Sequence, residues 1–170
     1  MSMHPVDVIV PVRGNAALAA RCVASVLASR NDQPCEVIVV GDADASHDFS
    51  AMLGAGSQRV AFSRQDRSLD YAGLLNRAFA LHGERDVVVL QADAEVAGNW
   101  LDRLAAHGRT QGTGIVGTFT NVAGSATYPK PNARNALPDG CTVEALDALF
   151  ARANAEDAAN VPPLFGAWLY

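Results

Sequence analysis

Residues Asp86-Val-Val-Val-Leu-Gln-Ala-Asp93-Ala-Glu95 decide the fold of this chain. The apolar run at 87–90 is typical of a strand that is buried on both faces. The chain then becomes polar and places Asp93 and Glu95 just past the end of that strand. In an open α/β sheet, ligands bind at the edge where the strands end. A carboxylate there is costly without a cationic partner, and a divalent metal carrying a phosphate is one such partner.

Short β-rich runs alternate with helical patterns on both sides of this strand. Leu18, Cys22 and Val26 recur at helical spacing, and Asn15 stands where it can cap that helix. The alternation predicts βαβ units and an α/β fold with a mostly parallel sheet. The predicted strands are 6–12, 35–40, 59–62, 87–90 and 114–119, with the start of another in 162–170, and the predicted helices are near 16–26, 49–53, 71–79, 100–104 and 143–154.

Composition is that of an ordinary globular domain. The 170 residues are 49% hydrophobic and 18% charged, with a net charge of −5, and this excludes a disordered chain. No basic patch is present, so we expect no nucleic-acid partner. The cysteines at 22, 35 and 141 lack the spacing of a zinc site or a disulfide framework, which favours a reducing cytosol and buried, apolar cysteines.

The two ends of the chain give different signals. The N-terminus is not a signal peptide, and no apolar run approaches the roughly 20 residues of a membrane span. The run 162–170 stops inside an apolar pattern, so we expect the natural protein to continue beyond Tyr170. Residues 120–140 are rich in Asn, Gly and Pro, and a loop of this length is usually functional or mobile.

Three polar clusters follow predicted strands, at 11–15, 41–48 and 91–95. The carboxyl ends of parallel strands meet at one edge, so the clusters outline a pocket. Their acids suit a base, a ribose and a metal, and their glycine and arginine suit a phosphate. The dinucleotide fingerprint, the P-loop and the G-x-S-x-G elbow are absent from the sequence.

The order of these segments resembles the family-2 glycosyltransferases over nearly the whole chain. The opening Val6-Asp-Val-Ile-Val-Pro-Val12 and the turn after it resemble that family's V-I-V-P-V-x-N, and residues 36–42 resemble its E-I-I-V-V-D-D. Asn76 falls where the family has an asparagine, and Leu90-Gln-Ala-Asp93 is similar to its L-D-x-D.

Later segments resemble one bacterial subgroup, the rhamnosyltransferase-like enzymes that build surface polysaccharides. These segments are Ile115-Val-Gly-Thr-Phe-Thr, Ser125-Ala-Thr-Tyr-Pro, Leu137-Pro-Asp-Gly-Cys-Thr and Leu146-Asp-Ala-Leu-Phe. A flavodoxin-like domain also fits the strand-helix alternation, but it does not explain Leu90-Gln-Ala-Asp93 or the long loop.

The resemblance implies a GT-A-like, Rossmann-like α/β/α sandwich forming one nucleotide-sugar-binding domain over 1–170. The intact enzyme would move a hexosyl or deoxyhexosyl unit, with inversion, from a UDP- or dTDP-linked sugar to a glycan or lipid-linked acceptor. It would work in the cytoplasm, peripheral at the inner membrane. The catalytic base would be an acid beyond Tyr170, past the strand that starts at Leu164.

The resemblance also implies roles for particular residues. Asp42 would hydrogen-bond the uracil or thymine ring, and Gln91 would lie by the ribose. Asp93 would bind Mn²⁺ or Mg²⁺, since hard cations prefer oxygen ligands. The cation would stabilise the departing nucleoside diphosphate as a Lewis acid. The implied nucleotide-binding residues are Pro11, Val12, Arg13, Asp42, Asn76, Gln91 and Ala92.

The chain departs from the family pattern at four places. Gly41 and Gln91 stand where the family has acids, Arg13 replaces an aromatic residue, and Ser68-Leu-Asp70 replaces Asn-x-Gly. Fewer acids weaken metal binding, because ligand charge helps to set affinity. The alternative function is therefore a non-catalytic or degenerate nucleotide-sugar-binding module.

Simpler structural roles stand beside these assignments. Asp93 could cap a helix near Asn99 or close a turn, and Asp42 could be an ordinary turn residue. Asn76 could hold its helix to a neighbouring loop rather than contact ligand. Phe79 and Trp100 are expected in the core.

Overall fold

The computed structural model describes residues 5–41, 49–64, 69–122, 124, 126–154, 158–161 and 168–170. The chain folds into two compact units, Met1–Ala28 with Gln33–Glu95 and Ser29–Asp32 with Val96–Tyr170. That these units act as one domain stays a prediction.

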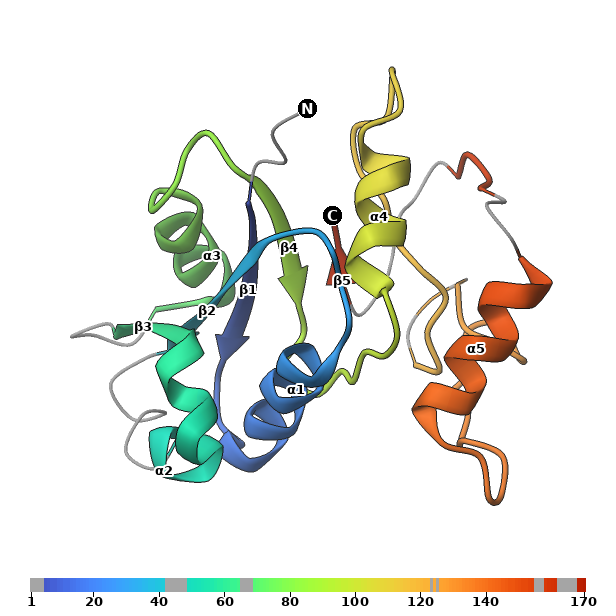
Figure 1. Ribbon diagram of the computed structural model, residues 1–170, viewed down its shortest axis with the longest axis horizontal. Coiled ribbons are helices and arrows are strands. Elements are labelled where there is room, and N and C mark those ends of the chain that lie inside the picture. The colour runs from blue at the N-terminus through green and yellow to red at the C-terminus, as the bar shows by residue number, and fades with distance from the viewer. Residues whose placement is uncertain are drawn as a thin grey trace. The chain divides into compact units, whose positions relative to one another are not determined.

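The first unit alternates strands and helices in the predicted order (Figure 1). Each predicted strand and helix of this unit is present, with ends shifted by only a few residues. The elements are β1 (Val6–Val12), α1 (Ala16–Ala28), β2 (Cys35–Gly41), α2 (Phe49–Leu53), the 3₁₀ turn η1 (Gly54–Arg59), β3 (Val60–Arg64), α3 (Tyr71–Phe79) and β4 (Asp86–Leu90).

The strands of this unit lie in the order β3-β2-β1-β4, and every pairing among them is parallel. β1 is central, with Ile9 opposite Ile38 of β2 and Val89 of β4. All the strands therefore end at the same edge of the sheet. The predicted α/β fold with a mostly parallel sheet is confirmed.

Alternate residues of the strands form two apolar faces, because successive side chains point to opposite sides. One face carries Ile9, Ile38 and Val40, which cluster with Leu74 and Ala78 of α3. These five residues are buried, so α3 is held by its apolar stripe rather than by propensity.

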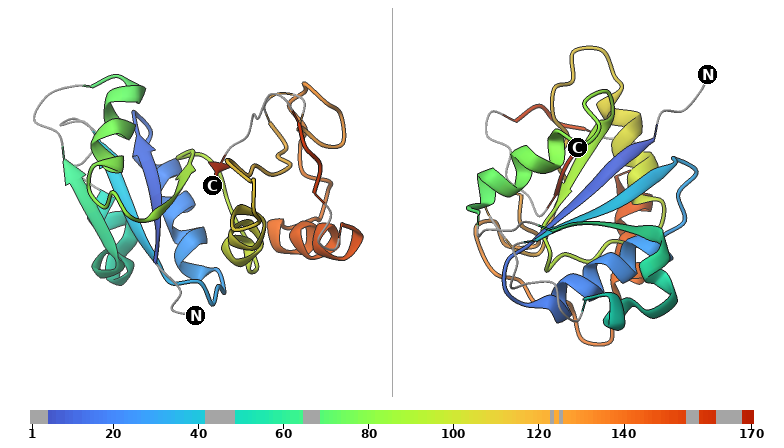
Figure 2. Two further views of the ribbon diagram at one scale, coloured as in Figure 1. Left: turned by 90° about the horizontal axis from the view of Figure 1, so that it is seen from above. Right: turned by 90° about the vertical axis from the view of Figure 1, so that its left-hand side faces the viewer.

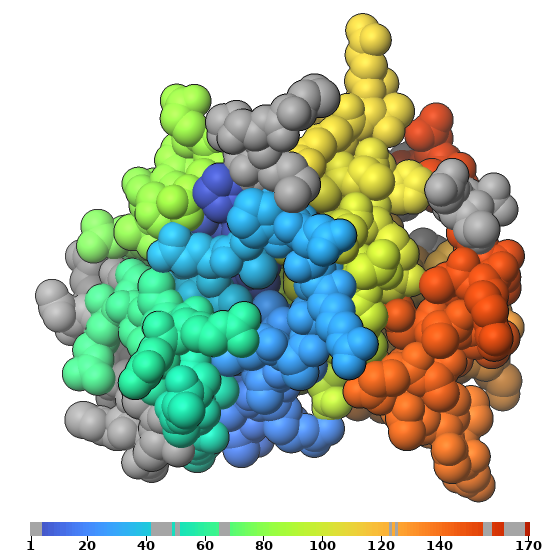
Figure 3. Space-filling view, viewed as in Figure 1, coloured from blue at the N-terminus to red at the C-terminus, as the bar shows by residue number. Residues whose placement is uncertain are grey.

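The other face is covered by α1 and α2. Val8 and Val10 of β1 are completely buried, and Phe49 of α2 packs edge-on against Phe62 of β3 with ring centroids 5.7 Å apart. Figure 2 shows α3 on the opposite side of the sheet from α1 and α2. In Figure 3, the side chains of α1 and α2 adjoin. The predicted three-layer sandwich is therefore confirmed.

Phe79 does not lie in the core, contrary to the prediction, because its side chain is 43% exposed. It follows buried Ala78 by one residue, which turns it by about 100° away from the buried stripe. Trp100 is only 4% exposed, as predicted.

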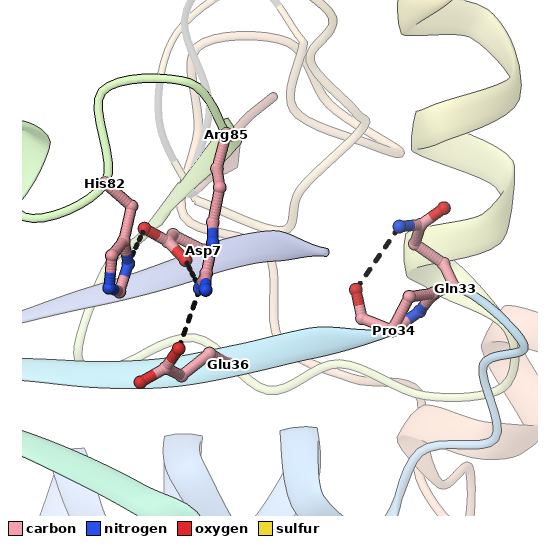
Figure 4. Close-up of polar contacts among 6 residues, drawn as sticks. All are labelled: Asp7, Gln33, Pro34, Glu36, His82 and Arg85. Carbon is pink, nitrogen blue, oxygen red and sulfur yellow. Dashed lines mark hydrogen bonds and ion pairs between the residues drawn. The ribbon is translucent and has the colours of Figure 1, made fainter. Parts of the chain in front are cut away.

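The amino edge of the sheet is closed by a charged network (Figure 4). Asp7 is 1% exposed at the start of β1, where its carboxylate lies 2.8 Å from His82 Nδ1 and accepts a 2.9 Å hydrogen bond from Arg85. The same Arg85 nitrogen donates to Glu36 of β2 at 2.7 Å. A buried carboxylate is tolerated only with such partners. The network therefore joins the start of β1 and β2 to the segment before β4.

The second unit contains α4 (Trp100–Gly108), α5 (Val143–Ala153) and β5 (Trp168–Leu169). Residues 29–32 attach to the start of α4, where Leu101 N–H donates to Asn31 Oδ1 at 2.9 Å. Arg103 of α4 pairs with Asp147 of α5. Among the described residues, no helix is long and apolar enough to span a membrane.

The predicted strand at 114–119 is wrong. Gly117 forms only an isolated antiparallel bridge with Leu169, and Val116 exchanges backbone hydrogen bonds of 2.8 and 2.9 Å with Tyr170. Gly114 and Gly117 contribute no side chain to a sheet face, which weakens strand formation. The run 114–119 therefore pairs with the end of the chain through one bridge and does not form a full strand.

The segment after this bridge is ordered by the buried side chain of Asn135. Its amide accepts from Lys130 N at 3.3 Å and donates to Lys130 O at 3.0 Å. Its backbone N–H donates to Asn121 O at 2.8 Å, and Asn121 Nδ2 donates back to Asn135 O at 3.1 Å. Side-chain amides thus replace the regular backbone pairing that this sequence lacks.

We expect Leu74→Ala to lower the free energy of unfolding by about 3 kcal/mol, because it leaves a cavity under α3. Phe79→Ala on the same helix should cost about 1 kcal/mol or less, because that ring is half exposed. Urea unfolding followed by circular dichroism measures both. Equal losses would contradict the assignment of the two side chains.

We expect Asp7→Asn to destabilise the fold by about 2 kcal/mol, since it removes a buried carboxylate that holds two partners. Glu36→Gln should cost less than about 1 kcal/mol, because that carboxylate is partly exposed to water. Both residues contact the same Arg85 nitrogen, but Asp7 is also buried and lies against His82, and these two differences set the larger loss. A smaller loss for Asp7→Asn than for Glu36→Gln in thermal unfolding would refute this account of the network.

Candidate functional site

The loops that leave the carboxyl edge of the sheet begin side by side. Val12, the last residue of β1, is in register with Gly41, the last residue of β2. β4 pairs with the other side of β1 and also ends at this edge, just before Gln91. Parallel pairing therefore gathers the segments that follow β1, β2 and β4 at one place, as the sequence predicted.

The loop after β1 divides its residues between core and solvent. Pro11 and Val12 are buried, and their contact with a nucleotide stays a prediction. The side chain of Arg13 is exposed. Gly14 has φ 101°, a conformation that favours glycine, and it lets the chain turn into α1. Asn15 caps that helix as predicted, because its Oδ1 accepts from the N–H groups of residues 17 and 18 at 3.0 and 3.2 Å.

The loop after β2 is described only at its first residue. Gly41 is half-buried in β2 and stands where the family that the sequence resembles has an acid. Asp42 lies outside the described residues, with the rest of 42–48, so its role in base recognition stays a prediction.

The loop after β4 opens with a tight turn at 91–94. Ala94 N–H donates to the Gln91 carbonyl at 3.0 Å, and Asp93 is the third residue of this turn. Gln91 and Asp93 are exposed and Ala92 is half-buried. α4 begins later and has Asn99 as its cap residue, so the alternative in which Asp93 caps that helix is wrong.

Helix α1 lies against this loop. The Cys22 thiol lies 3.5 Å from the Gln91 carbonyl oxygen, and Arg21 pairs with Glu95. Burial, followed by the negative charges of Asp93 and Glu95, raises the pKa of the Cys22 thiol to about 12. Both carboxylates are thus close enough to act on the thiol electrostatically.

Asn76 lies on an exposed position in the middle of α3, and its contact with a nucleotide stays a prediction. The start of α3 is set by Asp70, whose carboxylate accepts a 2.7 Å hydrogen bond from Gly73 N–H. The aspartate that replaces the family's glycine therefore has a clear local role as a helix cap.

A second group of possible metal ligands lies at the opposite edge of the sheet. Ligand atoms of Asp7, Glu36 and His82 all lie within 4.8 Å of one another. Arg85 donates to both carboxylates, and a cation in this group would compete with that guanidinium. The Asp93 carboxylate at the carboxyl edge is exposed, and its role as a metal ligand stays a prediction.

Sequence reasoning missed two of these contacts. Asp7 sits inside an apolar strand, and such a charge signals a buried partner, although the sequence does not identify it. Cys22 was correctly predicted to be buried, but its contact with Gln91 was not foreseen. Cys35 is exposed and Cys141 half-buried, contrary to the prediction that all the cysteines are buried.

Comparison with known proteins bears on this site and fold. No curated protein matches the chain. Among solved structures, a mannosyltransferase from Pyrobaculum calidifontis, determined in complex with GDP-Man and Mn²⁺, aligns with a TM-score of 0.55 and 21% identity. The alignment covers 66% of this chain and 34% of the mannosyltransferase, so this chain spans about a third of that protein's length.

The likeness supports the GT-A-like, Rossmann-like fold that the sequence predicted. The sequence profile described as Glycosyl transferase family 2 matches residues 7–164, which is nearly the whole chain. Through this match, the chain belongs to glycosyltransferase family 2.

Proposed function

We propose that the protein is the nucleotide-sugar-binding part of an inverting glycosyltransferase. It transfers a sugar from a UDP- or dTDP-linked donor to a glycan or lipid-linked acceptor in bacterial surface polysaccharide synthesis. The observation that carries the proposal is the exposed Asp93 carboxylate at the carboxyl end of β4, in a chain that matches the family from 7 to 164.

A divalent cation, Mn²⁺ or Mg²⁺, fits the donor set at this edge. The Asp93 carboxylate is the charged ligand, and Gln91 offers a neutral amide oxygen beside it. A bound cation would neutralise charge on the departing diphosphate. The solved mannosyltransferase with this fold holds GDP-Man and Mn²⁺, which supports the same pairing of nucleotide and metal here.

The other loops of the edge bind and orient the donor in this proposal. Arg13 offers an exposed guanidinium to phosphate oxygens, and Pro11 and Val12 form the floor of the pocket at the end of β1. Asp42 recognises the base and Ala92 lines the pocket beside Gln91. Asn76, exposed on α3, contacts the nucleotide in this proposal.

The second candidate is a non-catalytic nucleotide-sugar-binding module. Gln91 brings no charge where the family has an acid, and Glu95 is already paired with Arg21. The site thus has one exposed carboxylate in 91–95 rather than a pair. Release of nucleoside diphosphate from a bound sugar donor would argue against this candidate.

We expect UDP or dTDP to bind in the presence of Mn²⁺ and to lose affinity when the metal is chelated. Asp93→Asn should weaken Mn²⁺-dependent binding at least about tenfold, because ligand charge sets cation affinity. Isothermal titration calorimetry with UDP, dTDP and GDP measures the effect.

Glu84→Gln is the matched control. Glu84 is exposed and precedes the amino end of β4, away from Asp93 at the carboxyl end. Its substitution also removes one negative charge, and it should leave nucleotide binding unchanged. The proposal fails if no nucleoside diphosphate binds at millimolar concentration, and the metal role fails if Asp93→Asn binds like the wild type.

A further inference from the structure

The turn that carries Asp93 is closed by a single backbone acceptor. The Gln91 carbonyl takes the 3.0 Å hydrogen bond from Ala94 N–H, and Asp93 lies between these two residues. Ala94 is 8% exposed, whereas Asp93 is exposed. The direction of the Asp93 carboxylate therefore depends on how firmly the Gln91 carbonyl is held.

Helix α1 holds that same carbonyl from the other side. The Cys22 Sγ atom lies 3.5 Å from the Gln91 oxygen, and a carbonyl has two lone pairs, so it can accept from both Cys22 and Ala94. Cys22 is completely buried, and water cannot compete for this contact.

The preceding residue of α1 holds the far end of the same segment. Arg21 pairs with Glu95, two residues beyond Asp93. The pair is partly exposed, at 66% and 36%, so its contribution alone is small. Arg21 and Cys22, consecutive residues of α1, thus contact the loop on both sides of Asp93.

Helix α1 is a firm support for these contacts. Ala19 and Val23 are completely buried on its apolar stripe, which packs with β1 and α2. Side chains that are held by a packed helix lose little further freedom when they orient a neighbouring group.

We propose that Cys22, assisted by Arg21, is a positioning residue for Asp93 and sets the carboxylate in place for the divalent cation before the donor binds. This inference rests on the proposed function, because it assigns the Cys22 and Arg21 contacts to the metal site. The residues act through the Gln91–Ala94 turn and do not touch the cation themselves.

The first test needs no metal. In Cys22→Val, which removes the donor, we expect the Ala94 amide to exchange with deuterium about threefold to tenfold faster, the range set by the net worth of one hydrogen bond. Cys22→Ser retains a donor and should exchange within about twofold of wild type. Cys22→Ala provides a second donor-free variant if valine overfills the site.

Wild-type exchange in the donor-free variants would overturn the proposal. Equal acceleration in the serine and valine variants would overturn it as well, because packing rather than the hydrogen bond would then be responsible.

The second test measures the Mn²⁺ dissociation constant by electron paramagnetic resonance. Cys22→Val should weaken binding about threefold to tenfold, below the 10–100-fold that follows loss of a direct partner of a metal ligand. Cys22→Ser should restore the constant to within about twofold of wild type. A Cys22→Val protein with wild-type affinity overturns the proposal.

For Arg21, the direction of the change in Mn²⁺ affinity tests the proposal. Its removal takes away a positive charge, and simple Coulomb attraction then predicts tighter Mn²⁺ binding by Arg21→Ala. A positioning role predicts weaker binding, by about twofold. Arg21→Lys keeps the ion pair and should behave like wild type, and tighter binding by Arg21→Ala would overturn the role of Arg21.

The two tests separate this proposal from the function on which it rests. Wild-type protein that binds no Mn²⁺ contradicts the proposed function, and the exchange rates then decide alone whether Cys22 anchors the turn. Wild-type protein that binds Mn²⁺, with unchanged affinity in every Cys22 variant, overturns the positioning role and leaves the proposed function intact.

Discussion

Parallel pairing of β1 with β2 and β4 is the constraint on which the rest of the structure depends. Parallel neighbours cannot be joined by tight hairpins, so each connection crosses a face of the sheet and returns to the same edge. The register that places Val12 beside Gly41 starts two of the site loops side by side. The segment 91–95 follows β4 at the same edge, and the site is a direct consequence of topology.

The carboxylates at the two edges of this sheet have opposite environments. At the amino edge, buried Asp7 pairs with Arg85 and lies against the His82 ring, and the network serves stability. At the carboxyl edge, Asp93 is exposed on a turn, and Cys22 below it contacts the backbone rather than the carboxylate. A carboxylate left open to solvent on a well-anchored turn suits a ligand that arrives from outside.

Much of the fold could be predicted because it is encoded over short distances. Apolar runs fixed the strands of the first unit, and Asn15 marked the start of α1 through a contact only two and three residues away. The predictions were wrong where the residue types favour one structure and the tertiary packing produces another. The run 114–119 has the composition of a strand but pairs through an isolated bridge, and Phe79 keeps helical spacing but is turned outward.

The sequence by itself determined the order of the elements, the parallel sheet and the place of Asp93 just past a buried strand, because these follow from local periodicity and from chain connectivity. Tertiary structure alone decided which side chains far apart in the sequence meet. Cys22 meets Gln91 across 69 residues, and His82 meets Asp7 across 75. Such contacts depend on which helix covers which face of the sheet, and no local pattern in one sequence specifies that pairing.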